Sequence, residues 1–170
     1  VGPQVVGELR DKALLALAVS LFVTVIYIRV RFAEHSYGIA AMVALVHDVL
    51  VTLAALALGN HLGIVNGEIN LAMIAVFLTI IGYSVNDTIV IFDRVRENLR
   101  QRRKEPLRKL INDAVNQTLS RTLISNGTTF LTVLGLFLFG GEVLRGFAFT
   151  MVVGIIVGTY STIYIASPLV

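Results

Sequence analysis

One carboxylate lies inside an apolar segment where a membrane-spanning helix would bury it. Asp87 follows Asn86, and dense charge begins only at Asp93, six residues further on. At about 1.5 Å of rise per residue, this spacing puts Asp87 about 9 Å inside the edge of the apolar segment. An Asp at the centre of such a helix costs roughly 2.5–3.5 kcal/mol, and an acid in a dry site can bind a proton near neutral pH. Asp87 is therefore a candidate proton carrier; the alternative is a structural carboxylate bonded to a neighbouring helix.

A second acid and one arginine could share this chemistry. Asp48, beside His47, lies near the middle of an earlier apolar segment, and Arg121 begins a later one. A nearby cation favours the charged form of an acid, so Arg121 is the natural counter-charge for Asp87. The alternatives are that Arg121 reaches water at the membrane surface and that Asp48 is a packing group.

Polar side chains accompany these charges along two of the helices. They could carry protons through waters, or they could bond across helices at about 0.6 kcal/mol each. These supporting residues are Tyr83, Ser84, Asn86, Ser125 and Thr128.

Composition indicates a membrane protein with several spans. The 170 residues are 56% hydrophobic and 15% charged, whereas soluble domains are about 45–50% apolar and about 25% charged. A soluble all-helical core is the weaker alternative, because several apolar runs reach the ~18–20 residues that cross a bilayer.

The apolar runs predict an all-α membrane protein: a bundle of about five transmembrane helices plus a cytoplasmic amphipathic surface helix. Residues 1–12 form an extracytoplasmic lead-in, and residues 93–120 form a cytoplasmic basic loop and an amphipathic helix. Apolar residues recur at helical spacing from Leu107 to Leu119, so this helix is expected on the membrane surface. The predicted spans are 13–30, 38–58, 69–92, 121–139 and 147–166.

Small residues recur every four positions along the last predicted span. They include Gly146, Gly154 and Gly158. Small residues at this spacing let helix backbones approach closely, so we interpret these glycines as packing positions.

The Lys and Arg residues predict the orientation. If successive loops alternate sides, eleven of the 14 lie on one side, and only Arg10, Lys12 and Arg145 lie on the other. Positive residues mark the cytoplasmic side, so the N-terminus is expected outside and the C-terminus in the cytoplasm. An outside N-terminus without a signal peptide suggests that an upstream span is missing.

The basic block beside the spans is expected to orient the protein and to contact anionic lipid rather than nucleic acid. The chain has no cysteine and only three scattered histidines, which argues against a disulfide framework and a metal site. No cofactor other than protons is expected.

Longer motifs resemble a known family. The run from Gly82 to Asn98, GYSVNDTIVIFDRVREN, is long and specific. Shorter motifs accompany it, namely Val1-Gly2-Pro3, His47-Asp48-Val49, Leu119-Ser120-Arg121-Thr122-Leu123 and Phe139-Gly140-Gly141. Together they resemble the SecF branch of the SecD/SecF family of protein-export membrane proteins over essentially the whole chain.

The resemblance implies the membrane half of a resistance-nodulation-division type fold in a bacterial or archaeal cell (inner) membrane. It implies SecD, the SecYEG channel and YajC as partners, and use of the proton-motive force to assist protein translocation without covalent catalysis. The family's proton-carrying aspartate matches Asp87, its functional arginine matches Arg121, and Asp48 matches an acidic position of weaker role.

The family also has an N-terminal span and an extracytoplasmic domain that would contact exported preproteins, and both are absent from this sequence. Two alternatives stay open. One is the membrane half of a proton-coupled small-molecule exporter of the same superfamily, and the other is a purely structural partner of SecD.

Overall fold

The structure, a computed structural model, describes residues 3–32, 35–68, 70–102 and 104–170. Val1, Gly2, Ile69 and Arg103, which enter the sequence predictions, lie outside the described residues. The regular structure of the described residues is entirely helical, with no strand among them. The elements are α1 (Pro3–Phe32), α2 (His35–His61), α3 (Leu71–Gln101), α4 (Leu107–Phe139), α5 (Gly141–Ser161), the π-helical turn η1 (Thr162–Ala166) and the 3-10 turn η2 (Ser167–Leu169).

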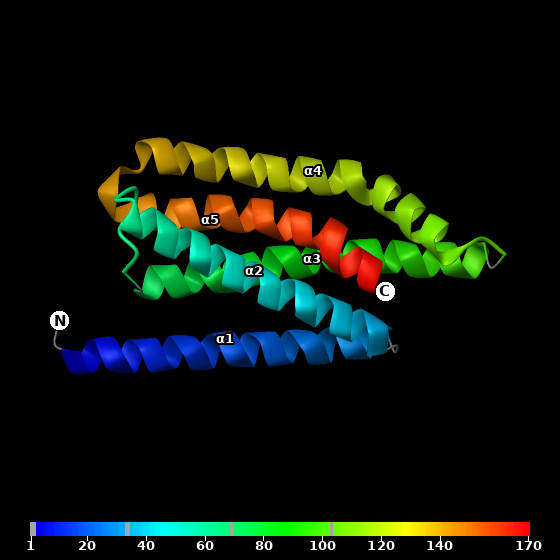
Figure 1. Ribbon diagram of the computed structural model, residues 1–170, viewed down its shortest axis with the longest axis horizontal. Coiled ribbons are helices and arrows are strands. Elements are labelled where there is room, and N and C mark those ends of the chain that lie inside the picture. The colour runs from blue at the N-terminus through cyan, green and yellow to red at the C-terminus, as the bar shows by residue number, and fades with distance from the viewer. Residues whose placement is uncertain (1–2, 33–34, 69, 103) are drawn as a thin grey trace.

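All five long helices contain stretches long and apolar enough to cross a membrane. Consecutive helices run antiparallel (Figure 1). The N-terminal end, the α2–α3 connection and the α4–α5 connection lie at one end of the molecule, while the α3–α4 connection extends beyond the other. The expected all-α bundle of about five spanning helices is therefore confirmed.

Two tight connections set how neighbouring helices meet. Asn70 caps α3, because its side-chain oxygen accepts a hydrogen bond from the backbone N–H of Met73 at 2.9 Å. Between α4 and α5 the chain reverses at Gly141, whose φ of 74° lies in the left-handed region. Glycine adopts this conformation without the steric cost that a Cβ would add.

The start of α1 differs from the predicted lead-in. The helix already begins at Pro3, so the described part of residues 1–12 is helical and continuous with the first span. Figure 1 shows α1 at the edge of the bundle. Its far end is held by Phe32, which packs with Tyr37 and Phe92, and by an ion pair of 2.9 Å between Arg31 and Asp93.

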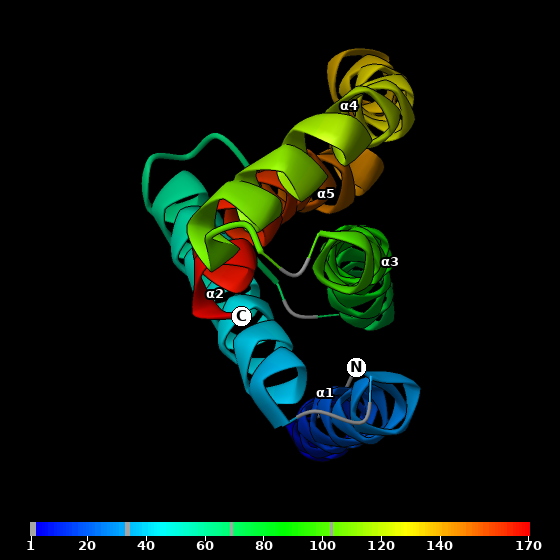
Figure 2. The same ribbon diagram turned by 90° about the vertical axis from the view of Figure 1, so that its right-hand side faces the viewer.

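The predicted amphipathic helix and fourth span form one helix, α4, without a break at residue 120. The start of α4 crosses the end of the bundle, and its later part runs along the bundle axis (Figure 2). Leu110 and Ala114 on its apolar face are buried, and Ala114 packs in a cluster with Ile91 and Val95 of α3. Part of the face that the sequence assigned to the membrane surface therefore packs against protein.

Polar contacts strengthen this hairpin between α3 and α4. The buried Asn98 donates a hydrogen bond to the carbonyl of Leu110 at 3.3 Å, and Arg102 pairs with Asp113 at 3.0 Å. These contacts hold the basic segment close to the bundle.

Helix α5 lies among α2, α3 and α4 (Figure 2). Its glycines face these neighbours. A Cβ on Gly154 would overlap the side chain of Ile80 on α3, and a Cβ on Gly146 would lie 2.8 Å from the carbonyl oxygen of Asn66. Close approach of α3 and α5 therefore depends on the missing side chain at Gly154.

We predict that Gly154→Ala lowers the stability of the protein by about 1–3 kcal/mol, because the added methyl group overfills a packed contact. Gly135→Ala is the matched control, since a Cβ at Gly135 meets nothing within 4 Å. Melting temperatures of the full-length protein in one detergent measure both. Equal melting temperatures for the two variants would contradict the packing role of Gly154.

Candidate functional site

Asp87 lies on α3, and its side chain is buried with 5% exposure. The amide nitrogen Nδ2 of Asn126, on α4, donates a hydrogen bond to Asp87 Oδ2. The same nitrogen donates to the hydroxyl oxygen of Thr159, on α5, at 2.8 Å. One amide therefore joins the buried acid to two neighbouring helices.

Asn126 contacts Asp87 but was not among the residues predicted from the sequence. Its other amide atom, Oδ1, is buried without a hydrogen-bond partner among the described residues. The buried polar face of α4 is formed by Thr118, Thr122 and Asn126, spaced four residues apart. This spacing was visible in the sequence, but the neighbouring face that begins at Arg121 contains more conspicuous charge.

Asp48, on α2, is completely buried. Its Oδ2 accepts a hydrogen bond of 2.5 Å from the hydroxyl of Ser84 on α3, and its Oδ1 lies 3.2 Å from Nδ1 of His47. Gly158, on α5, lies beside this contact, since a Cβ there would be in ordinary van der Waals contact with Oδ2 of Asp48 at 3.8 Å. Ser161 of α5 is a further hydrogen-bond partner, so the second acid is held by residues of α2, α3 and α5.

A small cavity lies beside Asp87. Its volume is about 10 Å³, at the lower limit of what one water molecule needs. Ser84 borders this cavity together with Asp87 and also donates its hydrogen bond to Asp48. Ser84 is therefore the residue that borders the cavity of one acid and hydrogen-bonds the other.

The other predicted residues divide into two groups. Tyr83 is half-buried, and its hydroxyl lies 3.4 Å from that of Thr129 on α4. The side chains of four residues are exposed on the outer face of the bundle, namely Asn86, Arg121, Ser125 and Thr128. Within the described residues, no ion pair or hydrogen bond joins Arg121 to Asp87.

These exposed polar residues lie around the contact between α3 and α4. Asn86 is one turn from Tyr83, and Ser125 is one turn from Thr129, so both flank the Tyr83–Thr129 contact. We call Asn86, Arg121, Ser125 and Thr128 the polar outer face. Among the described residues, no group of three or more His, Asp or Glu could hold a metal ion.

The whole chain matches a family model. Residues 1–170 match the model described as protein export membrane protein SecD/SecF, C-terminal. The chain is 50% identical over 169 residues to the protein translocase subunit SecF of Koribacter versatilis, which covers 99% of this chain and 40% of the relative. It is 48% identical over 170 residues to SecF of Rhodothermus marinus, which covers 100% of this chain and 55% of that relative.

A solved structure has the same architecture. The crystal structure of SecDF, a translocon-associated membrane protein from Thermus thermophilus, superposes with a TM-score of 0.85 at 43% identity. The match covers 99% of this chain and 22% of that protein. The chain thus spans about half the length of the curated relatives that it matches.

We predict that Asp87 and Asn126 are energetically coupled. A double-mutant cycle with Asp87→Asn and Asn126→Leu should give an interaction free energy of about 0.5–3 kcal/mol, because the two side chains share a buried hydrogen bond. Asp87→Asn combined with Thr132→Val is the control, since Thr132 is exposed on α4. Unfolding of the full-length protein in detergent measures both cycles. Additive effects in the first cycle would show that the hydrogen bond contributes nothing to stability.

Proposed function

The chain belongs to the SecD/SecF family of protein-export membrane proteins, and we propose that it forms the membrane half of a SecF-type translocase subunit driven by the proton-motive force. In this proposal Asp87 carries the proton. The observation that carries the proposal is the buried Asp87, which is held by a neutral amide from a second helix.

A single neutral partner suits an acid that must change its protonation state. Asn126 can donate to a charged carboxylate through its nitrogen, and its unpaired Oδ1 can accept a hydrogen bond from a protonated one. An arginine in this position would strongly favour the charged form. The charge of Arg121 also acts on Asp87, but without an ion pair or hydrogen bond between them among the described residues, so the site supports both states of Asp87.

Protonation would act on the packing of the helices. Asn126 joins α4 to Asp87 on α3 and to Thr159 on α5, so neutralising the acid weakens a contact shared by three helices. One charge that crosses 100 mV is worth about 2.3 kcal/mol. This energy matches a typical coupling of ~1–3 kcal/mol between sites, so one proton can shift the packing.

Asp48 would be a second stop on the proton path. Ser84 contacts Asp48 and borders the cavity beside Asp87, which supports a path that crosses from α2 to α3. Protons are the only cofactor in this proposal.

The polar outer face supports a protein partner in the membrane. Arg121 and Asn86 are exposed on helices that lie in the membrane in this proposal, and ionisable or amide groups facing lipid are costly. We propose that SecD covers this face and that Arg121 acts there, either beside Asp87 or beside a charged group of SecD.

The wider setting follows from the same family role. We propose a multi-pass protein of the bacterial or archaeal inner membrane, with the N-terminus of this chain outside and the C-terminus in the cytoplasm. SecYEG, YajC and exported preproteins would be its further partners, the preproteins through an extracytoplasmic domain. The structural neighbour SecDF is a translocon-associated membrane protein, which supports this setting.

The proposed contact with SecD predicts protection of the polar outer face. The native chain has no cysteine, so Asn86→Cys and Ser125→Cys each introduce a single reactive thiol. Labelling by a membrane-permeant maleimide should fall at least about tenfold when SecD is present, because SecD buries these positions. Phe22→Cys, on the exposed side of α1, should label equally with and without SecD. Equal labelling of all three variants in both conditions would exclude SecD from this face.

The proposed proton carrier predicts loss of transport in Asp87→Asn, because the amide keeps the shape of the side chain but cannot carry the proton. Proton flux and preprotein release should both fall at least about tenfold in vesicles with full-length protein, SecD and SecYEG. The matched control is Asp93→Asn, which also removes an acid from α3. Asp93 forms its ion pair with Arg31, near the end of α1. This control variant should retain most of the activity. Full flux and release in Asp87→Asn, with the complex intact, would refute the proposal.

A further inference from the structure

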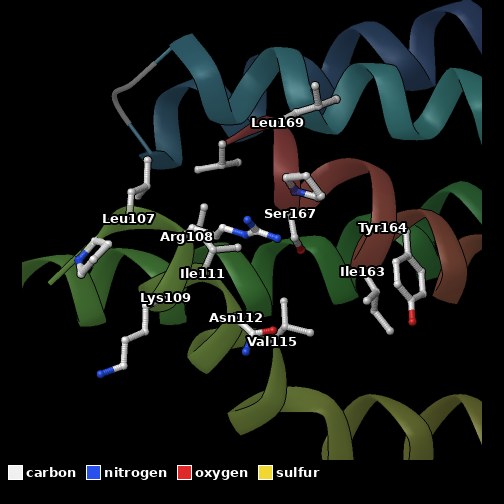
Figure 3. A pocket seen from close by; sticks show the side chains of 13 residues that line it. Leu107, Arg108, Lys109, Ile111, Asn112, Val115, Ile163, Tyr164, Ser167 and Leu169 are labelled. Carbon is white, nitrogen blue, oxygen red and sulfur yellow. The ribbon is translucent and has the colours of Figure 1, made fainter.

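A large cavity lies where the start of α4 faces the end of the chain (Figure 3). Its volume is about 1110 Å³. Leu107, Ile111 and Val115 line it from α4, and Ile163 and Tyr164 line it from η1. The cavity is therefore bordered by mostly apolar side chains at the end of the bundle that contains the basic segment.

An apolar groove lies beside the cavity, between α4 and α5. This second space has a volume of about 410 Å³ and shares Ile163 and Tyr164 with the first. Asn126 and Thr159, which hold Asp87, also line the groove. The cavity at the basic end of the molecule and the groove beside the partners of the buried acid are therefore neighbours.

Arg108 supplies the charge of the large cavity. Its side chain points across the cavity toward Ser167 (Figure 3), and no ion pair or hydrogen bond joins it to another described residue. Lys109 also lines the cavity, but its ammonium group pairs with Glu105 at 3.1 Å. A free guanidinium binds a phosphate group through two parallel hydrogen bonds.

We propose that the cavity and the groove together bind one anionic phospholipid. Arg108 binds its phosphate, and one acyl chain lies in the groove between α4 and α5. The groove extends along α5 from Tyr164 back to Ile155, nine residues or about 13.5 Å of helix. Half of a bilayer's hydrocarbon core is about 15 Å thick, so the groove has the length of one acyl chain in one leaflet.

The bound chain would have a second effect at the site of Asp87. It would cover Asn126 from the lipid side of the groove and keep water away from the Asp87–Asn126 hydrogen bond. This consequence for proton transfer rests on the proposed function, whereas the binding site itself does not. Lipid binding can therefore be tested without a transport assay.

The test uses full-length protein with SecD in vesicles of phosphatidylcholine containing phosphatidylglycerol with a photoreactive acyl chain. Gly127→Leu should reduce crosslinking of this probe to α4 and α5 at least about fivefold. Gly127 lines the groove, and a Cβ there meets nothing within 4 Å, so the larger side chain fills the groove without disturbing its neighbours. Gly135→Leu, at another open glycine of α4 outside the groove, should crosslink as the unmodified protein does.

The headgroup contact is tested in the same vesicles. Arg108→Gln should reduce crosslinking of the phosphatidylglycerol probe at least about fivefold, whereas Arg100→Gln, at an exposed arginine outside the cavity, should not. A phosphatidylcholine probe with the same photoreactive chain should crosslink weakly and independently of Arg108. Melting temperatures and co-purification of SecD identify variants that fail to fold. If Gly127→Leu fails to fold, Gly127→Ala takes its place in the comparison, and if Arg108→Gln fails to fold, Arg108→Lys takes its place.

Three results would overturn the proposal. The first is equal crosslinking in Gly127→Leu and Gly135→Leu, and the second is equal crosslinking in Arg108→Gln and Arg100→Gln. The third is a groove occupied by a segment of SecD, recognised because phospholipid crosslinks to α4 and α5 only when SecD is absent.

Discussion

A carboxylate inside an apolar bundle must have a hydrogen-bond donor within the bundle, and the structure depends on how that donor is supplied. Asn126 supplies it for Asp87 and at the same time contacts Thr159, so the acid, α4 and α5 share one polar contact. Burial of an unpaired charge would be prohibitive. The need to hold Asp87 therefore fixes which face of α4 points into the bundle and which face remains outside.

The close packing of α5 makes the second polar contact possible. Gly154 lets α3 approach α5, and Ser84 of α3 lies near Gly158 while it donates its hydrogen bond to Asp48 of α2. The glycines thus contribute to the chemistry of the site as well as to the stability of the bundle. The groove between α4 and α5 reaches the same region from the lipid side, since Asn126 lines it too. Helix packing, the buried acids and the proposed lipid site are therefore parts of one arrangement.

Much of this arrangement could be predicted from the sequence, for identifiable reasons. The five spans follow from length and apolar composition, and the burial of Asp87 and Asp48 follows from their positions within those spans. The inward face of α4 could not be predicted, because the helix has polar residues on two neighbouring faces. The surroundings are apolar both inside the bundle and in the membrane, so either face could have pointed inward. Arg121 drew attention to the face that is exposed in this chain, whereas Asn126 lies on the buried one. The continuity of α4 was also missed, because the change from amphipathic to apolar character suggested a break where the helix only changes direction.

The central claim is that Asp87 gains and loses a proton in the membrane, and infrared difference spectroscopy tests it most directly. Full-length protein reconstituted with SecD would be measured with and without an imposed proton gradient. The account predicts a carbonyl band from a protonated carboxylic acid that changes with the gradient and is absent in Asp87→Asn. A gradient-dependent band that persists unchanged in Asp87→Asn, or no such band in the unmodified protein, would contradict it.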